Sequence, residues 1–202
     1  MSNVLLNQYS TIVDSIKRES GDKSCPIWLL VNLKYPEDTS NIWNPILYEI
    51  QDMVYRKLHA RINSRKIFVS HAVSDIVRVP NTSIEANAAK NIENLRESVL
   101  KHQPKLIFTF GAITNEFVRR VFYIKPENRS KYWSTSNLGD EFERSIANFD
   151  ITQINWIPLV RRIPKTNKNL KDWEETNDYY RDVAAKIAEK IIENKESLKI
   201  WI

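Results

Sequence analysis

The chain is poor in cysteine and in glycine. Its 202 residues include one cysteine, Cys25, and three glycines. A single cysteine excludes an internal disulfide, and it excludes an iron–sulfur cluster held by four thiolates. A chain of this length can bury a sufficient apolar core without covalent staples, so we expect a protein that suits the reducing cytoplasm.

Long apolar runs are also missing. No stretch approaches the roughly 18 apolar residues of a membrane-spanning helix. The first twenty residues contain no apolar run long enough for a signal peptide. The three histidines, His59, His71 and His102, have no partners at metal-ligand spacing. We therefore expect no membrane contact and no metal. We also expect a monomer in the cytoplasm that has no other cofactor.

The composition is otherwise that of an ordinary globular protein with a modest basic excess. Apolar residues make up 42% of the chain and charged residues 27%, and the formal net charge is +5. The pI is about 9.2. The length predicts a single domain over residues 1–202. The basic excess is compatible with a nucleic-acid partner but does not identify one.

Short apolar runs alternate with helical patterns along the chain. The runs at 26–32, 66–73, 105–110 and 151–159 predict four strands. Helices are predicted over 4–20, about 43–62, 82–102, 114–122 and 171–198, and the polar segment 125–150 is predicted to be irregular. Strands that alternate with helices favour a three-layer α/β/α sandwich around a central four-stranded parallel sheet.

The third strand ends in a glycine, Gly111, directly before a helical pattern. Glycine allows the tight turn that such a junction needs. Thr114 and Asn115 fall near the start of the helix, where free amide groups favour an anion such as a phosphate. Ligands of open parallel sheets bind beyond the carboxyl ends of the strands. A glycine at a strand–helix turn needs no ligand, so a purely structural role stays open.

The order of elements in Phe68–Thr114 matches a known pattern. A strand ends in a polar residue, and a polar loop and a helix follow. Then come Gln103-Pro104-Lys105, a hydrophobic strand and the Phe110-Gly111 turn. This arrangement resembles the uracil-DNA glycosylase superfamily, and the resemblance extends over residues 26 to about 190. It implies a uracil-DNA glycosylase-like fold and a monofunctional DNA glycosylase that needs no cofactor.

The family's first catalytic motif corresponds to LVNLKYPED, Leu30 to Asp38. The resemblance places Asn32 on the motif residue that positions the attacking water, while Leu33 and Lys34 replace the family's Pro-Gly pair. Glu37 and Asp38 follow as catalytic candidates, either as a base or as stabilisers of the oxocarbenium ion. Each of them could equally cap the following helix.

Base-binding candidates come from the same comparison. Trp43 matches the Trp of the family's Asn-x-x-Trp segment, and Tyr35 and Lys34 lie in the altered loop. His71 falls where many members carry an Asn that reads the base edge. A histidine presents a different pattern of donors and acceptors. A strand-end histidine satisfied by backbone groups is the open alternative.

The family's third motif, His-Pro-Ser, has no counterpart after the fourth strand. In its place, Leu159–Lys171 contains five basic residues and no acidic one, which suits a loop that grips phosphates beside an extruded nucleotide. A solvated basic loop is the alternative. The predicted DNA contacts are Gly111, Thr114, Asn115, Arg161, Arg162, Lys165 and Lys168.

These departures from the family motifs predict that the preferred substrate base is not plain uracil. We expect an enzyme that hydrolyses the N-glycosidic bond of a flipped, modified or damaged base and leaves an abasic site. Such an enzyme could serve DNA repair or defence against phages with modified DNA. One alternative is a catalytically inactive nucleic-acid-binding protein with the same fold. Another is an unrelated doubly wound domain that binds a nucleotide at Gly111–Asn115.

Overall fold

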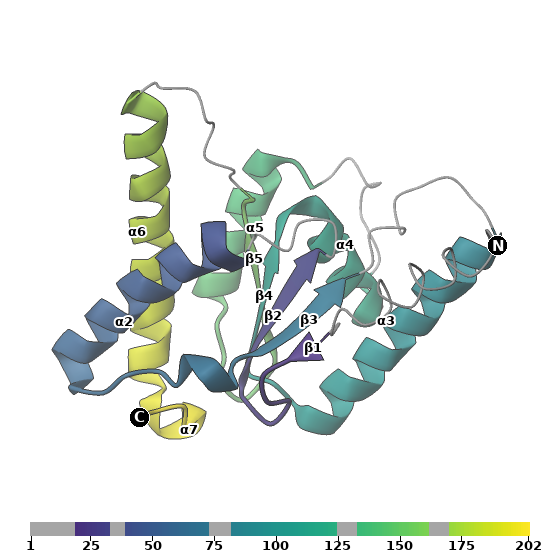
Figure 1. The fold of residues 1–202 in the computed structure, drawn as a ribbon, viewed down its shortest axis with the longest axis horizontal. Helices are drawn as coiled ribbons and strands as arrows, with labels where there is room; N and C mark the ends of the chain where they lie inside the picture. The colour runs from purple at the N-terminus through teal and green to yellow at the C-terminus, as the bar shows by residue number, and fades with distance from the viewer. Residues whose placement is uncertain (1–18, 33–38, 73–81, 125–132, 162–169) are drawn as a thin grey trace, which may run out of the picture.

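The computed structural model describes residues 19–32, 39–72, 82–124, 133–161 and 170–202, and of residues 71–72, 82–88, 135 and 170–177 it describes the backbone alone. The described chain is an α/β structure built on one five-stranded sheet (Figure 1). The strands are β1 (Glu19–Ser20), β2 (Ile27–Asn32), β3 (Phe68–Ala72), β4 (Leu106–Phe110) and β5 (Asn155–Leu159). Their order in the sheet is β1-β3-β2-β4-β5.

The four strands predicted from the apolar runs are present and mutually parallel. The prediction of a purely parallel four-stranded sheet was wrong, because β1 adds an antiparallel strand at the outer edge of β3. Two-residue strands such as β1 are too short to give a hydrophobic pattern. Residues 19–20 were predicted as the end of a helix, and the rest of that prediction lies outside the described residues.

Helices connect the strands and follow the last of them. They are η1 (Thr39–Trp43, a π-helix), α2 (Asn44–Leu58), η2 (Ser64–Lys66, a 3₁₀-helix), α3 (Thr82–His102), α4 (Gly111–Val121), α5 (Thr135–Ala147), α6 (Leu170–Glu193) and α7 (Lys195–Leu198). The helices predicted near 43–62, 82–102, 114–122 and 171–198 are confirmed, with shifted ends. Helix α5 corrects the prediction that 125–150 is irregular. Its first turn is capped by Ser134, whose side chain accepts a hydrogen bond from the Asn137 N–H at 3.2 Å.

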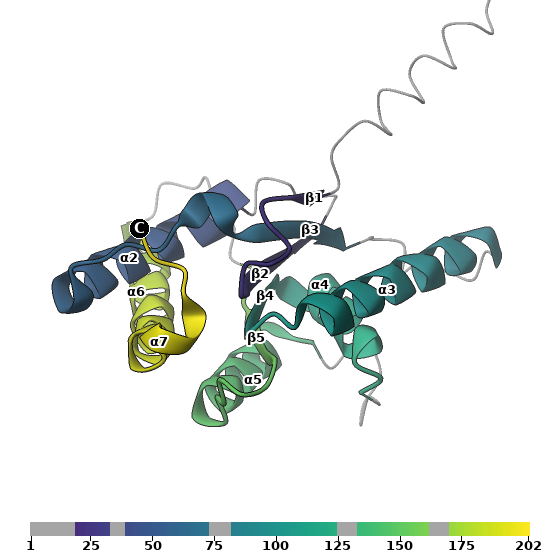
Figure 2. The same ribbon diagram turned by 90° about the horizontal axis from the view of Figure 1, so that it is seen from below.

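Side chains from the two faces of the sheet enter two separate apolar clusters. On β2, Ile27, Leu29 and Val31 join the cluster that includes residues of α2, α5 and α6. Trp28 and Leu30 join the other cluster, with residues of α3 and α4. Figure 2 shows α2 and α6 on one side of the strands and α3 and α4 on the other. Because both faces of β2 are covered, its sequence is apolar at nearly every position.

The strand order creates a topological switch point between β2 and β4. The chain passes from β2 to β3 on one side, then returns to place β4 on the other side of β2. In doubly wound sheets, ligands bind in the crevice outside the carboxyl ends of the strands at such a point. Asn32, the last residue of β2, and Gly111, the first residue after β4, lie at this point.

The turn from β4 into α4 requires glycine. Gly111 has φ +76°, in the left-handed region, and a Cβ there would lie 3.0 Å from the Arg161 Cβ. We expect Gly111→Ala to lower the free energy of unfolding by about 1–3 kcal/mol. An alanine would be strained by the left-handed backbone conformation, and its Cβ would crowd the Arg161 side chain. Urea unfolding followed by circular dichroism measures this change.

Gly139 in α5 is the matched control. An added Cβ there would meet nothing within 4 Å. Gly139→Ala should stabilise the protein by about 0.5–1 kcal/mol, since alanine is the better helix former. Equal changes in the free energy of unfolding of the two variants would contradict the special role of the Gly111 turn.

Candidate functional site

Three chain segments meet at the carboxyl edge of the sheet. Asn32 ends β2, Gly111 follows β4, and Val160 and Arg161 follow β5. Leu30 is paired with Thr109, and Phe110 with Leu159. Asn32 therefore lies at the level where β4 turns into α4, and α4 itself contacts β2. The sheet thus brings Asn32, Gly111 and Arg161, which are distant in sequence, to the same edge.

Asn32 is a buried polar residue at this edge, with 2% of its surface exposed. Strand alternation places its side chain on the face occupied by Trp28 and Leu30, the face covered by α3 and α4. A buried amide is retained only where hydrogen bonds satisfy it. Asn32 takes part in an interaction within the folded chain, and it is the polar residue at the end of an otherwise apolar strand.

The stem of Arg161 lies across the start of α4. Its Cβ, Cγ and Cδ atoms would lie 3.0, 3.9 and 3.6 Å from a Cβ at Gly111. The missing side chain of Gly111 thus leaves room for an arginine beside the first turn of a helix. In this turn Ala112 is exposed and Ile113 half-buried. The first amide groups of a helix and a guanidinium both favour an anion nearby.

Thr114 and Asn115 have internal partners and are fully buried. The Thr114 hydroxyl donates to the carbonyls of Phe110 at 2.8 Å and of Gly111 at 3.1 Å. The Asn115 amide donates to the Gly111 carbonyl at 2.7 Å. Both side chains therefore brace the turn, and this geometry supports a structural role rather than direct contact with DNA.

The same turn is tied to β5 through a residue that the sequence did not single out. The Asn115 Oδ1 atom accepts hydrogen bonds from the Thr109 hydroxyl at 2.6 Å and from the Trp156 indole N–H at 3.0 Å. Trp156 also donates to the Thr109 hydroxyl at 3.0 Å. A polar threonine within a buried strand was the available sequence signal. The network joins β4, α4 and β5 beneath the carboxyl edge.

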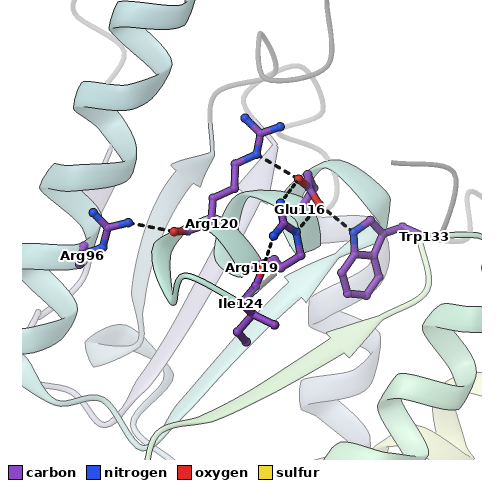
Figure 3. A network of polar contacts seen from close by, with 6 residues as sticks. All are labelled: Arg96, Glu116, Arg119, Arg120, Ile124 and Trp133. Carbon is purple, nitrogen blue, oxygen red and sulfur yellow. Dashed lines mark hydrogen bonds and ion pairs between the residues drawn. The ribbon is translucent and has the colours of Figure 1, made fainter. Parts of the chain in front are cut away.

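A second polar cluster, which sequence reasoning missed, surrounds Glu116 (Figure 3). The carboxylate accepts hydrogen bonds from Arg119 at 2.6 and 2.8 Å and from Arg120 at 3.0 Å. The Trp133 indole N–H donates to it at 3.1 Å. Acid and arginines at i, i+3 and i+4 on one helix were the available signal. Arg119 also donates to the Ile124 carbonyl, so the cluster holds the segments on both sides of residues 125–132.

Charge and hydrogen bonding set the ionisation of Glu116. Burial raises the pKa of this carboxyl, but the hydrogen bonds from Arg119, Trp133 and Arg120 outweigh burial and hold the pKa at about 2. Glu116 is therefore ionised at neutral pH and balances two adjacent arginines. Its role is to anchor α4 rather than to exchange protons.

The other predicted site residues fall into three groups. Trp43 is 3% exposed and packs on Phe108 with ring centroids 4.9 Å apart, which gives it a place in the core. The backbone of His71 is paired with Val31 and so lies one strand away from Asn32 at the same edge. The residues outside the described part of the chain are Lys34, Tyr35, Glu37, Asp38, Arg162, Lys165 and Lys168.

A depression of about 260 Å³ lies between α5 and β5. Its lining includes Arg144 and Ser145 on α5 and Trp156 and Pro158 on β5. Arg144 pairs with Glu141 in the same lining. No residue predicted from the sequence to bind or act on a ligand lines this depression.

Comparison with known proteins adds no relative. Neither a scan against models of protein families nor a search of curated proteins finds a match for this sequence.

Within the described residues, no group of three or more His, Cys, Asp or Glu side chains is placed to hold a metal ion. In that same part of the chain, every helix is too short or too polar to cross a membrane.

The ionised Glu116 predicts an acid-sensitive contribution to stability. Its pKa is about 2 in the folded chain against an ordinary 4.5, so its contribution is complete above about pH 5 and is lost as the pH falls toward 2. The linked loss is on the order of 3 kcal/mol. We expect the stability difference between the parent chain and Glu116→Gln to shrink by this amount over that range. Urea unfolding at pH 2.5–7 measures it, and a pH-independent difference would contradict it.

Proposed function

We propose that this chain is a DNA glycosylase, a divergent member of the uracil-DNA glycosylase superfamily with its α/β/α sandwich. It would act in the cytoplasm as a monomer and hydrolyse the N-glycosidic bond of a flipped, modified or damaged base. The observation that carries the proposal is the meeting of Asn32, Gly111 and Arg161 at the switch point of the sheet.

The chemistry of this reaction needs three things at one place. A water molecule must be held at the sugar C1′, the departing base must be stabilised, and the flanking phosphates must be gripped. Asn32 ends β2 as a buried amide, and an amide can orient water through both its donor and its acceptor. Arg161 supplies a fixed positive charge beside the first turn of α4.

Helix α6 lies beside the same edge of the sheet, since Tyr179 on this helix binds Val160 after β5. Figure 1 shows its first turns rising past the carboxyl ends of the strands. The basic segment 159–171 runs from the end of β5 into this helix. A nucleotide bound at the switch point would therefore have backbone amides, an arginine and a helix around it. This arrangement favours a phosphate-bearing ligand over a neutral one.

A panel of DNA substrates tests the proposed activity. Single- and double-stranded oligonucleotides that each carry one modified or damaged base are incubated with the protein, then treated with alkali to cleave abasic sites. The proposal expects alkali-dependent cleavage at one class of modified base. Tight DNA binding without cleavage of any substrate would favour the catalytically inactive nucleic-acid-binding alternative.

Asn32→Ala should separate catalysis from binding. If Asn32 orients the attacking water, excision should slow by about 10²–10⁴-fold while DNA affinity stays nearly unchanged. Single-turnover excision and fluorescence anisotropy measure the two quantities, and thermal melting checks that the variant folds. Asn148→Ala, at the exposed end of α5, is the control. An equal loss of rate and affinity, or no loss, would assign Asn32 another role.

Arg161→Ala should reduce the salt dependence of DNA binding. Each lost phosphate contact lowers the slope of log affinity against log salt by about 0.9 on duplex DNA. Phosphate contacts carry no sequence information, so modified and unmodified strands should be affected alike. Arg56→Ala is the charge-matched control, because Arg56 is exposed near the far end of α2 and pairs with Asp52. An unchanged slope in Arg161→Ala would remove Arg161 from the DNA interface.

A further inference from the structure

Two adjacent tyrosines on α6 bind the two chain segments that flank the proposed site. The Tyr179 hydroxyl accepts a hydrogen bond from the Val160 backbone N–H at 2.8 Å. The Tyr180 hydroxyl donates to the Asn41 carbonyl at 3.0 Å. The two rings are 5.8 Å apart. One turn of a single helix is thus fixed both to the end of β5 and to η1.

The Tyr179 hydroxyl binds the backbone of the residue that directly follows β5. Val160 is 5% exposed, and a buried N–H beyond the last ladder pair needs an acceptor. The phenol oxygen supplies it one residue before Arg161. The stem of Arg161 lies against Gly111. The backbone before Arg161 is thus held by Tyr179, and the stem of its side chain lies against the first residue of α4.

The Tyr180 hydroxyl binds the other segment, η1, through the Asn41 carbonyl. Asn41 belongs to η1, the π-helix that follows residues 33–38 and leads into α2. π-helical turns are rare and often occur at functional sites. Tyr180 is 6% exposed and lies in the core cluster shared by α2 and α6. Its hydroxyl therefore ties η1 to a buried residue of α6.

Tyr179 lies well inside α6, after its first two turns. Leu170 begins α6, so nine residues, about 13 Å of helix, precede Tyr179. These turns extend beyond the strand ends in Figure 1. The hydrogen bond from Val160 to Tyr179 thus joins α6 to the end of β5, just after the first nine residues of the helix.

We infer that Tyr179 is a positioning residue of the DNA-binding site, which acts by holding Arg161 across Gly111. The inference rests on the proposed function for its ligand, a DNA phosphate. It assigns no contact with DNA to Tyr179 itself. Tyr180 holds the other side of the edge and acts independently of Arg161.

A double-mutant cycle tests this inference. Tyr179→Phe keeps the ring and removes only the acceptor oxygen. It should weaken DNA binding by about 2- to 12-fold, the value of one hydrogen bond. In the Arg161→Ala background the same change should have almost no effect, because the residue through which Tyr179 acts is gone. Tyr180→Phe should instead have the same effect in both backgrounds.

Two further measurements separate positioning from general stability. Amide hydrogen exchange at Val160 should accelerate in Tyr179→Phe while exchange in the core strands stays slow. Tyr55→Phe is the control, since the Tyr55 ring is half-exposed and packs against Arg61 and His59 near the end of α2. It should change neither DNA affinity nor exchange at Val160.

The outcomes distinguish the inference from the proposed function. If Arg161→Ala binds DNA with the parent affinity and salt slope, the proposed DNA interface fails. If Arg161→Ala weakens binding but Tyr179→Phe does not, the positioning role is overturned and the interface stands. The positioning role is also overturned if Tyr179→Phe has an equal effect with and without Arg161.

Discussion

The left-handed turn at Gly111 is the constraint on which the arrangement of this protein depends. A buried parallel strand must end there, reverse into α4 and leave room for the stem of Arg161. Glycine suits both requirements, since a Cβ would be strained at φ +76° and would lie 3.0 Å from the Arg161 Cβ. The turn is then locked from below by Asn115, which bonds to the Gly111 carbonyl and to Trp156. The position of the proposed site follows from this one junction.

The rest of α4 is anchored at a second place. Glu116 collects hydrogen bonds from two arginines and a tryptophan, and Arg96 donates to the Arg120 and Val121 carbonyls near the helix end. A helix held along its length keeps its first turn in place. Functional groups on rigid elements keep their geometry better than groups on loops. The backbone at the Gly111 edge is therefore held in place by α4.

The sequence predicted the parallel strands and most helices because buried strands and amphipathic helices have strong periodic signals. It missed β1, which is two residues long, and α5, whose polar face obscured the pattern. Within the site, the turn at Gly111 was predictable from local chemistry. The inward bonding of Thr114 and Asn115 and the contact between Tyr179 and Val160 were not, because they depend on partners that only the folded chain brings close.

A structure of the protein bound to duplex DNA that contains an abasic-site analogue would show where DNA binds. If the chain is a glycosylase with its site at the switch point, the abasic sugar should lie at the carboxyl edge between β2 and β4, with Asn32 facing C1′ and the Arg161 guanidinium on a neighbouring phosphate. DNA bound elsewhere, for example over the depression between α5 and β5, with the Gly111 edge empty, would contradict this placement.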